Sequence, residues 1–208
     1  MVVEVIQHSF GDQNGVRLVD RQDAAYDQVC QFVHDQYKLH FDCDLRHYMP
    51  SHLVLFEEDR IMAVAGIRAA NTESLFLEQY LDESIEESIL AKMHQVMDRS
   101  KIVEVGGFAA RDHLSALKLM LQLSRQLDEM GFEMLVCAAN RPIQKCLKLS
   151  GFTWKILGEV RPERVDHSAN HWGKYYQSRP SLLAGVIAQS KTLLEARTRQ
   201  DMQLEAVV

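Results

Sequence analysis

The chain has 208 residues, of which 47% are hydrophobic and 25% are charged, and its formal net charge is −6. These values are typical of a soluble globular protein with a sizeable core, and the lack of a lysine- or arginine-rich block argues against a nucleic-acid-binding surface. The first residues do not resemble a signal peptide and no stretch approaches the ~20 apolar residues that cross a bilayer, so we expect a cytoplasmic protein without a transmembrane segment.

The first half of the chain alternates between short apolar runs and helical patterns. Apolar residues at Ala25, Val29 and Phe32 recur at helical spacing, and Asp20 is the candidate cap of that helix. Two apolar runs around the acidic turn at 57–60 predict a β-hairpin. The elements expected here are strands at 2–6 and 16–19, a helix at 22–39, a hairpin at 51–70, a short apolar segment at 76–81 and a helix at 85–99.

The second half contains the runs expected to form the centre of a sheet. A single charged residue, Glu104, interrupts the first of them, which predicts a central strand with one buried carboxylate. Asp112 can cap the long helix that follows, and Gly131 is its natural stop. The elements expected here are strands at 102–109, 133–139, 154–157 and 172–176, a helix at 112–130, a short helix after Asn140, a C-terminal helix at 181–199 and a loose tail at 200–208. This alternation predicts a single α/β domain over 1–199 with a mixed sheet.

The segment from Asn140 to Phe152 is the most informative motif. Asn140 follows an apolar run and can accept hydrogen bonds from the free amides of a first helical turn. Pro142 suits the start of a helix, where its missing N–H costs nothing. Gly151 supplies the left-handed residue that ends a helix. The segment therefore predicts a strand, an Asn cap, one short helix and a Gly-Phe exit.

This unit resembles the last acyl-thioester-binding segment of the GCN5-related N-acetyltransferase superfamily. The resemblance implies a mixed, twisted sheet with helices on both faces and a V-shaped splay between the strands at 102–108 and 133–139. An acyl thioester of coenzyme A or acyl carrier protein would enter the splay, and Asn140 would hold its pantetheine. That superfamily binds the coenzyme A pyrophosphate with glycines at the start of its central helix, whereas here Gly106 and Gly107 come earlier and Asp112 would repel a pyrophosphate.

A second resemblance involves the same strand. Glu104-Val105-Gly106-Gly107-Phe108-Ala109 resembles the Glu-x-Ser-Arg-Phe-Ala strand of the acyl-homoserine lactone synthases, which share the acetyltransferase fold and take acyl chains mainly from acyl carrier protein. Gly66-Ile67-Arg68 resembles their Gly/Cys-x-Arg strand end, and Asp42 and Asp44 stand where they have an acidic pair. Gly107 replaces their motif arginine, so their substrate does not follow from the resemblance.

Most of the chain resembles the thermostable hemolysin family. The matching runs are H-Y-M-P at 47–50, A-G-I-R-A-A at 65–70, L-F-L-E-Q-Y-L-D at 75–82 and W-G-x-Y-Y at 172–176. The fold of that family is considered acetyltransferase-like, whereas its name records a lytic activity. The resemblance therefore implies an acyltransferase fold, and the name is a poor guide to biochemistry.

Two residues are candidates for proton transfer. Glu104 would take a proton from an attacking amine, because burial raises the pKa of a carboxyl toward the range of a general base; the alternative is an ion pair with Arg68 or Arg111. Tyr176 would donate a proton to the leaving thiolate, because Leu147 stands where acetyltransferases often carry a tyrosine. The alternative for any single tyrosine is aromatic packing.

The remaining candidates form two groups. The thioester carrier would be held by Gly106, Gly107, Phe108, Ala109, Arg111 and Asn140, and the acceptor by Arg68, Glu78, Tyr80 and Tyr175. Arg68 could grip a carboxylate or carbonyl of the acceptor, or it could form an ion pair with Asp44, Glu78 or Glu104. Glu78 and Tyr80 could instead reflect the alternation of a half-buried strand.

Metal and disulfide chemistry receive little support from the sequence. His167 and His171 could share a helix face, but no third and fourth metal ligand follows at a suitable spacing. The cysteines lie far apart without a C-x-x-C pair, which indicates free thiols in a reducing compartment.

The function expected from these patterns is acyl transfer from acyl-coenzyme A or acyl carrier protein to the amine of a small molecule, without a metal. Two alternatives stay open, namely a membrane-active hemolysin without turnover and an acyl-binding module without activity. The segment 181–194 has an apolar face without the basic opposite face of a membrane-active helix, and it could pack on the sheet or on a second subunit, which would make a homodimer.

Overall fold

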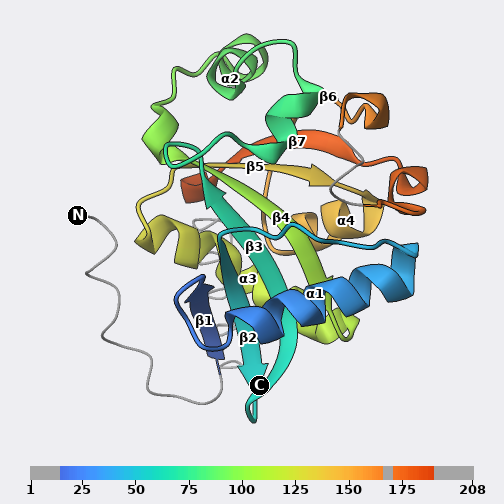
Figure 1. Cartoon of the computed structure of the whole chain (residues 1–208). Coiled ribbons are helices and arrows are strands. Elements are labelled where there is room, and N and C mark those ends of the chain that lie inside the picture. The colour runs from blue at the N-terminus through green and yellow to red at the C-terminus, as the bar shows by residue number, and fades with distance from the viewer. Residues whose placement is uncertain (1–14, 166–170, 190–208) are drawn as a thin grey trace, which may run out of the picture.

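The computed structural model describes residues 15–165 and 171–189, and these form a seven-stranded sheet of order β1-β2-β3-β4-β5-β7-β6 (Figure 1). The strands are β1 Gly15–Asp20, β2 Ser51–Glu57, β3 Arg60–Ala69, β4 Ile102–Ala110, β5 Met134–Ala139, β6 Lys155–Glu159 and β7 Ser181–Val186. The α-helices are α1 Tyr26–Phe41, α2 Ile85–Met93, α3 His113–Glu129 and α4 Arg141–Leu149. Short 3-10 helices lie at η1 Phe76–Tyr80, η2 Arg99–Lys101, η3 Pro162–Arg164 and η4 Tyr175–Ser178.

Helices cover both faces of the sheet, as predicted. Side chains alternate between the faces along a strand, so Val103 packs with the apolar face of α3, whereas Val64 packs with that of α1. Figure 1 shows α1 in front of the sheet and α3 behind it. The α2 helix and η1 pack against Ile102, Met134 and other residues of the front face. The result is a mixed α/β sheet between two helical layers.

The two central strands part after a short paired stretch. β4 and β5 are the only neighbouring strands of the described sheet that run parallel, and their pairing ends at Glu104 and Val136. Beyond these residues β4 pairs only with β3, and β5 pairs only with β7. The predicted splay is therefore confirmed, and main-chain groups on both of its sides lack a ladder partner.

A bulge reshapes β4 inside the splay. The register pairs Val64 with Ala109 but Gly66 with Gly106, so β4 contains one residue more than β3 across this step. Gly107 has a φ of 56°, which a residue without Cβ adopts at little cost. A bulge of this kind bends the strand and changes the direction of its side chains.

The caps of α3 and α4 follow the sequence prediction. Asp112 accepts a hydrogen bond from the Ser115 amide, and Asn140 accepts one from the Ile143 amide. Gly151 has a φ of 79° just after α4. In contrast, Asp20 does not cap α1, because that helix begins after Ala25 without a side-chain cap.

Several predicted elements are wrong. The C-terminal helix expected from Ser181 is instead strand β7, which enters the sheet between β5 and β6, because its apolar run is buried on both faces. The strand expected at 172–176 is replaced by the 3-10 helix η4, and the helix expected at 85–99 ends at Met93. The short apolar segment at 76–81 forms the 3-10 helix η1, so the alternation of a strand does not explain Glu78 and Tyr80. The expected strand at 2–6, the tail at 200–208 and the rest of the C-terminal helix after 189 lie outside the described residues.

Candidate active site

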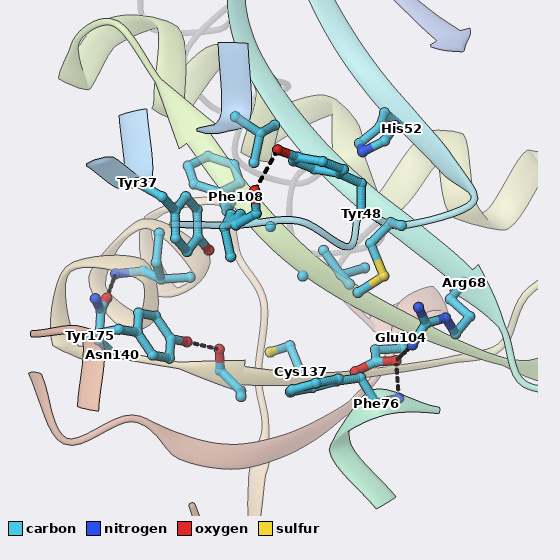
Figure 2. Close-up of a pocket in the computed structure, with 18 of the residues that line it drawn as sticks. Tyr37, Tyr48, His52, Arg68, Phe76, Glu104, Phe108, Cys137, Asn140 and Tyr175 are labelled. Atoms are coloured by element: carbon cyan, nitrogen blue, oxygen red, sulfur yellow. Dashed lines mark hydrogen bonds and ion pairs between the residues drawn. The ribbon is translucent and has the colours of Figure 1, made fainter. Parts of the chain in front are cut away.

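A cavity of about 410 Å³ occupies the splay between β4 and β5 (Figure 2). One group of lining residues belongs to the front face, and a second group belongs to the core behind the sheet, from α3, α4 and the rear face of β5. The first group includes Tyr37, Phe41, Tyr48, Phe76, Tyr80, Glu104, Trp172 and Tyr175, and the second includes Met120, Leu123, Leu135, Cys137, Ile143 and Leu147. The cavity therefore passes through the sheet, with its charged groups on the front side and apolar side chains behind.

Glu104 lies at the point where the strands part. The residue is 3% exposed, and its carboxylate accepts hydrogen bonds from the amides of Phe76 at 2.8 Å and Leu77 at 3.0 Å. Burial raises the pKa of this carboxyl, while Arg68 and the two amides oppose the rise. A carboxylate whose pKa is raised is a stronger base than an exposed one, and its place beside the cavity suits a general base.

Arg68 is the charged partner of Glu104. Its Nη1 lies 3.4 Å from Glu104 Oε2, and its Nε lies 3.5 Å from the Glu73 carboxylate. The first distance exceeds the usual 2.7–2.9 Å of a charged hydrogen bond, so the pair is loosely made. Both alternatives for Arg68 thus have support, because the guanidinium pairs with Glu104 and also lines the cavity.

An aromatic wall closes the front side of the cavity. Trp172 lies between Phe76, at 5.6 Å between ring centroids, and Tyr175, at 5.4 Å. The Tyr175 hydroxyl lies 3.5 Å from the Ala138 carbonyl, and burial raises its pKa well above its usual range. At neutral pH this phenol keeps its proton and could donate it.

Met49 covers a pair of glycines on the cavity floor. A Cβ on Gly66 would lie 2.5 Å from Met49 Cγ, and a Cβ on Gly106 would lie 2.6 Å from Met49 Cε. Neighbouring strands therefore carry glycine so that the thioether can lie against their backbones.

His52 is a buried neutral base on the same floor. It is 1% exposed, and its ring lies 5.5 Å from that of Tyr26. Burial lowers the pKa of His52 to about 4. The imidazole is therefore uncharged at neutral pH.

This buried histidine predicts an acid-dependent loss of stability. The unfolded side chain binds a proton near pH 6.5, whereas folded His52 binds one only near pH 4, so the unfolded state gains the proton first as the pH falls. We expect His52 to lower the free energy of unfolding by roughly 3 kcal/mol between pH 7 and pH 4. Urea denaturation at both pH values should show a smaller loss for His52→Gln, and an equal loss in both proteins would contradict the assignment.

The thioester side of the site begins at Asn140. This residue lines the cavity and caps α4, whose Ile143 and Leu147 also line it. Gly106, Gly107 and Phe108 border the splay from β4, as predicted. Across the splay, the Asp112 carboxylate occupies the first turn of α3.

Some predicted site residues lie elsewhere. Glu78 is absent from the cavity lining, because its carboxylate forms two 2.8 Å hydrogen bonds with Arg99 and accepts from the Leu75 amide. Tyr176 also lies outside the lining, and it contacts lining residues through a 2.9 Å hydrogen bond to Tyr80 and ring contacts with Trp172 and Tyr175. Arg111 donates to the Ile61 carbonyl and stacks over a ring of α1. The structure therefore does not bring Glu78, expected in the acceptor wall, Tyr176, expected as proton donor, or Arg111, expected at the carrier, to the cavity lining; Ala109 likewise does not line the cavity.

The lining residues that did not emerge as candidates from the sequence include Tyr37, Met49, His52 and Trp172. A signal existed for His52, which is a polar residue in an apolar strand, and for Met49, which belongs to the H-Y-M-P run. Tyr37 has an ordinary place on an amphipathic helix, and only the tertiary structure brings it to the cavity.

Two properties of the described residues concern the other functional hypotheses. In the ranges 15–165 and 171–189, no helix is long and apolar enough to cross a membrane. In the same part of the chain, no group of three or more His, Cys, Asp or Glu side chains could hold a metal ion.

Comparison with solved structures supports the fold. The acyl-homoserine lactone synthase LasI matches with a TM-score of 0.58 and 15% identity, over 88% of this chain and 95% of the other. FeeM, an N-acyl amino acid synthase from uncultured soil microbes, matches with a TM-score of 0.57 and 15% identity, over 86% and 92%. The CoA-dependent acyl-homoserine lactone synthase BjaI, with SAM and isopentyl-CoA, gives a TM-score of 0.59 and 15% identity, over 88% and 89%. The chain therefore has the fold of these acyl-transferring proteins.

Comparison of sequences identifies the family. No curated protein sequence matches the chain. The family model described as thermostable hemolysin matches residues 19–191, which include the whole sheet from β2 to β7 and every cavity residue named above. The chain belongs to the thermostable hemolysin family.

Proposed function

We propose that this protein is an N-acyltransferase that moves an acyl group from a pantetheine thioester to the amine of a small molecule. The observation that carries the proposal is the buried Glu104 carboxylate at the point where β4 and β5 part, beside a cavity that passes through the sheet. The likeness to synthases that act on acyl groups supports the same reaction class. In this proposal the front side of the cavity holds the groups that transfer protons, and the rear side holds the acyl chain.

The chemistry requires one base and one acid. Glu104 takes a proton from the amine, whose nitrogen attacks the thioester carbonyl; the new C–N bond forms as the C–S bond breaks. The leaving thiolate takes a proton, and the donor we propose is Tyr175, because it lines the cavity and its hydroxyl lies beside β5, 3.5 Å from the Ala138 carbonyl. Unpaired main-chain groups of the splay would hold the carbonyl oxygen as charge develops.

Direct attack by the amine is favoured over an acyl-enzyme intermediate. Cys137 is the thiol that lines the cavity, and burial raises its pKa to about 12. The thiolate is the nucleophilic form, so at neutral pH Cys137 is an inert part of the apolar wall.

The rear half of the cavity favours an extended acyl chain over an acetyl group. Met120, Leu123 and Leu147 are each at most 3% exposed, and they belong to the core behind the sheet. An open apolar space in a core costs stability, and an acyl chain that enters it gains about 0.8 kcal/mol per buried methylene. The donor we propose is therefore a medium- or long-chain thioester.

The charges around the thioester entrance favour a carrier protein as the donor. Asp112 fills the α3 N-terminus with a carboxylate whose pKa is lowered by the Ser115 amide, so this helix end repels a pyrophosphate. On α4, Arg141, Lys145 and Lys148 are exposed, and none has an ion-pair partner among the described residues. This cationic helix begins at the cavity and complements an acidic carrier protein.

Charge reversal on α4 tests the carrier. With an acyl carrier protein donor, Lys145→Glu/Lys148→Glu should raise KM by about tenfold or more, with a smaller effect at high salt, because rim charges steer association. The same acyl group on free pantetheine should react at the wild-type rate. Arg60→Glu/Lys92→Glu, which changes the net charge equally on other exposed surfaces, is the control. Equal losses in both double variants would remove the docking surface.

An assay with purified protein tests the proposed function. Acyl carrier protein and coenzyme A thioesters, from acetyl to hexadecanoyl, are incubated with a panel of amines, and thiol release and product mass are measured. Amide formation that depends on the protein is expected. Liposome leakage at stoichiometric protein, with no amide from any donor, would replace the proposal by the lytic alternative.

A further inference from the structure

Buried polar atoms without hydrogen bonds gather at the cavity. Among the described residues, five buried side-chain polar atoms have no hydrogen-bond partner, and three of these belong to cavity residues: His52 Nδ1, Arg68 Nε and Trp172 Nε1. Such atoms are costly unless a ligand or water satisfies them. Two of the three, on Arg68 and Trp172, can only donate, so the group that satisfies them must be an acceptor, such as a water oxygen or a carboxylate of a ligand.

Both donors belong to residues close to the general base. Arg68 contacts the Glu104 carboxylate directly, and Trp172 packs on Phe76, whose amide donates to the same carboxylate. A ligand amine that reaches Glu104 would therefore place a neighbouring substituent near Arg68 or Trp172.

The charges here match those of a zwitterion. Glu104 and Arg68 are loosely paired at 3.4 Å, so each can exchange its partner for an opposite charge on a ligand. An ammonium beside Glu104 and a carboxylate on Arg68 restore two ion pairs in place of one, and the planar guanidinium suits a carboxylate. The rings of Tyr37, Phe41 and Tyr175 surround the rest of this front side.

We infer that the acceptor is an α-amino acid with a large apolar or aromatic side chain, held through its carboxylate by Arg68 and the Trp172 indole N–H. This inference rests on the proposed function for its product, an N-acyl amino acid. The ammonium first loses one proton through Glu104 to solvent. As the neutral amine attacks, the C–N amide bond forms, the C–S bond breaks, Glu104 receives the second amine proton and the leaving sulfur is protonated. The carboxylate of the acceptor remains unreacted.

Matched acceptors test the inference. Phenylalanine is compared with phenethylamine, and leucine with isopentylamine, which lack only the carboxylate. We expect kcat/KM to favour the amino acid by about 100-fold or more, because a site built for a polar group rejects the analogue without it. Acylation of an amine at the same kcat/KM as its amino acid would overturn the inference while leaving the proposed function intact.

Two variants test whether Trp172 and Arg68 recognise the carboxylate of the acceptor. Trp172→Phe keeps the ring and removes the N–H, so KM for phenylalanine should rise by about tenfold while phenethylamine is unaffected. Arg68→Gln changes Glu104 as well, so its readout is the ratio of the two acceptors, which should fall to near one. A ratio that stays at its wild-type value in both variants would overturn the assignment.

A binding measurement separates the two ideas if no amine is acylated. Calorimetric titration of the wild-type protein with phenylalanine and phenethylamine needs no turnover. Tighter binding of phenylalanine that is lost in Arg68→Gln would support the inference even though the proposed function had failed. Equal affinity for both ligands would overturn the inference.

Discussion

Replacing Glu104 with glutamine is expected to lower kcat/KM for acyl transfer by about 10²- to 10⁴-fold, the usual contribution of a general base. The amide cannot accept the amine proton, although it nearly preserves the size of the side chain. Steady-state kinetics with the best thioester and acceptor of the panel measures the loss. An unchanged kcat/KM would remove Glu104 as the base and leave its carboxylate as a structural acceptor for Phe76 and Leu77.

The dependence of acyl-transfer activity on pH tests the same role of Glu104. Burial raises the pKa of Glu104, and the reactive form is the ionised one, so activity should rise with pH through a pKa above the usual value of about 4.3. In Glu104→Gln this acid limb should disappear from the residual activity. Glu73→Gln is the matched control, because Glu73 also contacts Arg68 but is more exposed; its profile should keep the limb.

Replacing Met120 with tryptophan is expected to shift the acyl-chain preference toward short chains. Met120 lies on α3 behind the sheet, where the larger side chain would fill the rear half of the cavity. If a long chain loses the burial of four methylenes, at about 0.8 kcal/mol each, its kcat/KM falls by roughly 200-fold. The acetyl thioester should react as it does with the wild-type protein.

A second tryptophan variant controls for changes in folding. Met130 packs against the same core but does not line the cavity, so Met130→Trp should leave the chain preference unchanged. Competition between dodecanoyl and acetyl thioesters, read by product mass, compares the proteins. A uniform loss for both chain lengths in Met120→Trp would place the acyl chain elsewhere.

The match between sequence and structure is best where local chemistry is sufficient. The caps at Asp112 and Asn140 are decided by a side chain and the amides two or three residues away, so the starts of α3 and α4 could be predicted. The burial of Glu104 could be predicted because a lone charge in an apolar strand has nowhere else to point. The parted strands followed from the resemblance that the Asn140 unit carries.

The errors arise where one pattern permits two structures. Residues 181–186 form an apolar run that suits either a buried strand or a buried helix. In the folded protein this run pairs with β5 on one side and β6 on the other, and so it forms a strand. Glu78 has the same residue type and a similar apolar setting as Glu104, yet its nearest cation is Arg99, which the fold places against it. Sequence periodicity contains no information about such a partner.

The sequence by itself determined the family, the class of fold, the caps of two helices and the buried carboxylate at the strand junction, because each depends on short-range patterns or on a specific run of residues. Only the tertiary structure decided which side chains share the cavity. The segment with Met49 and His52, the end of β3 with Arg68, and Trp172 come from different parts of the chain, and the packing of the sheet against its helices brings them to one space. Long-range packing of this kind is set by the shape and burial of all the elements together, so no local segment specifies it.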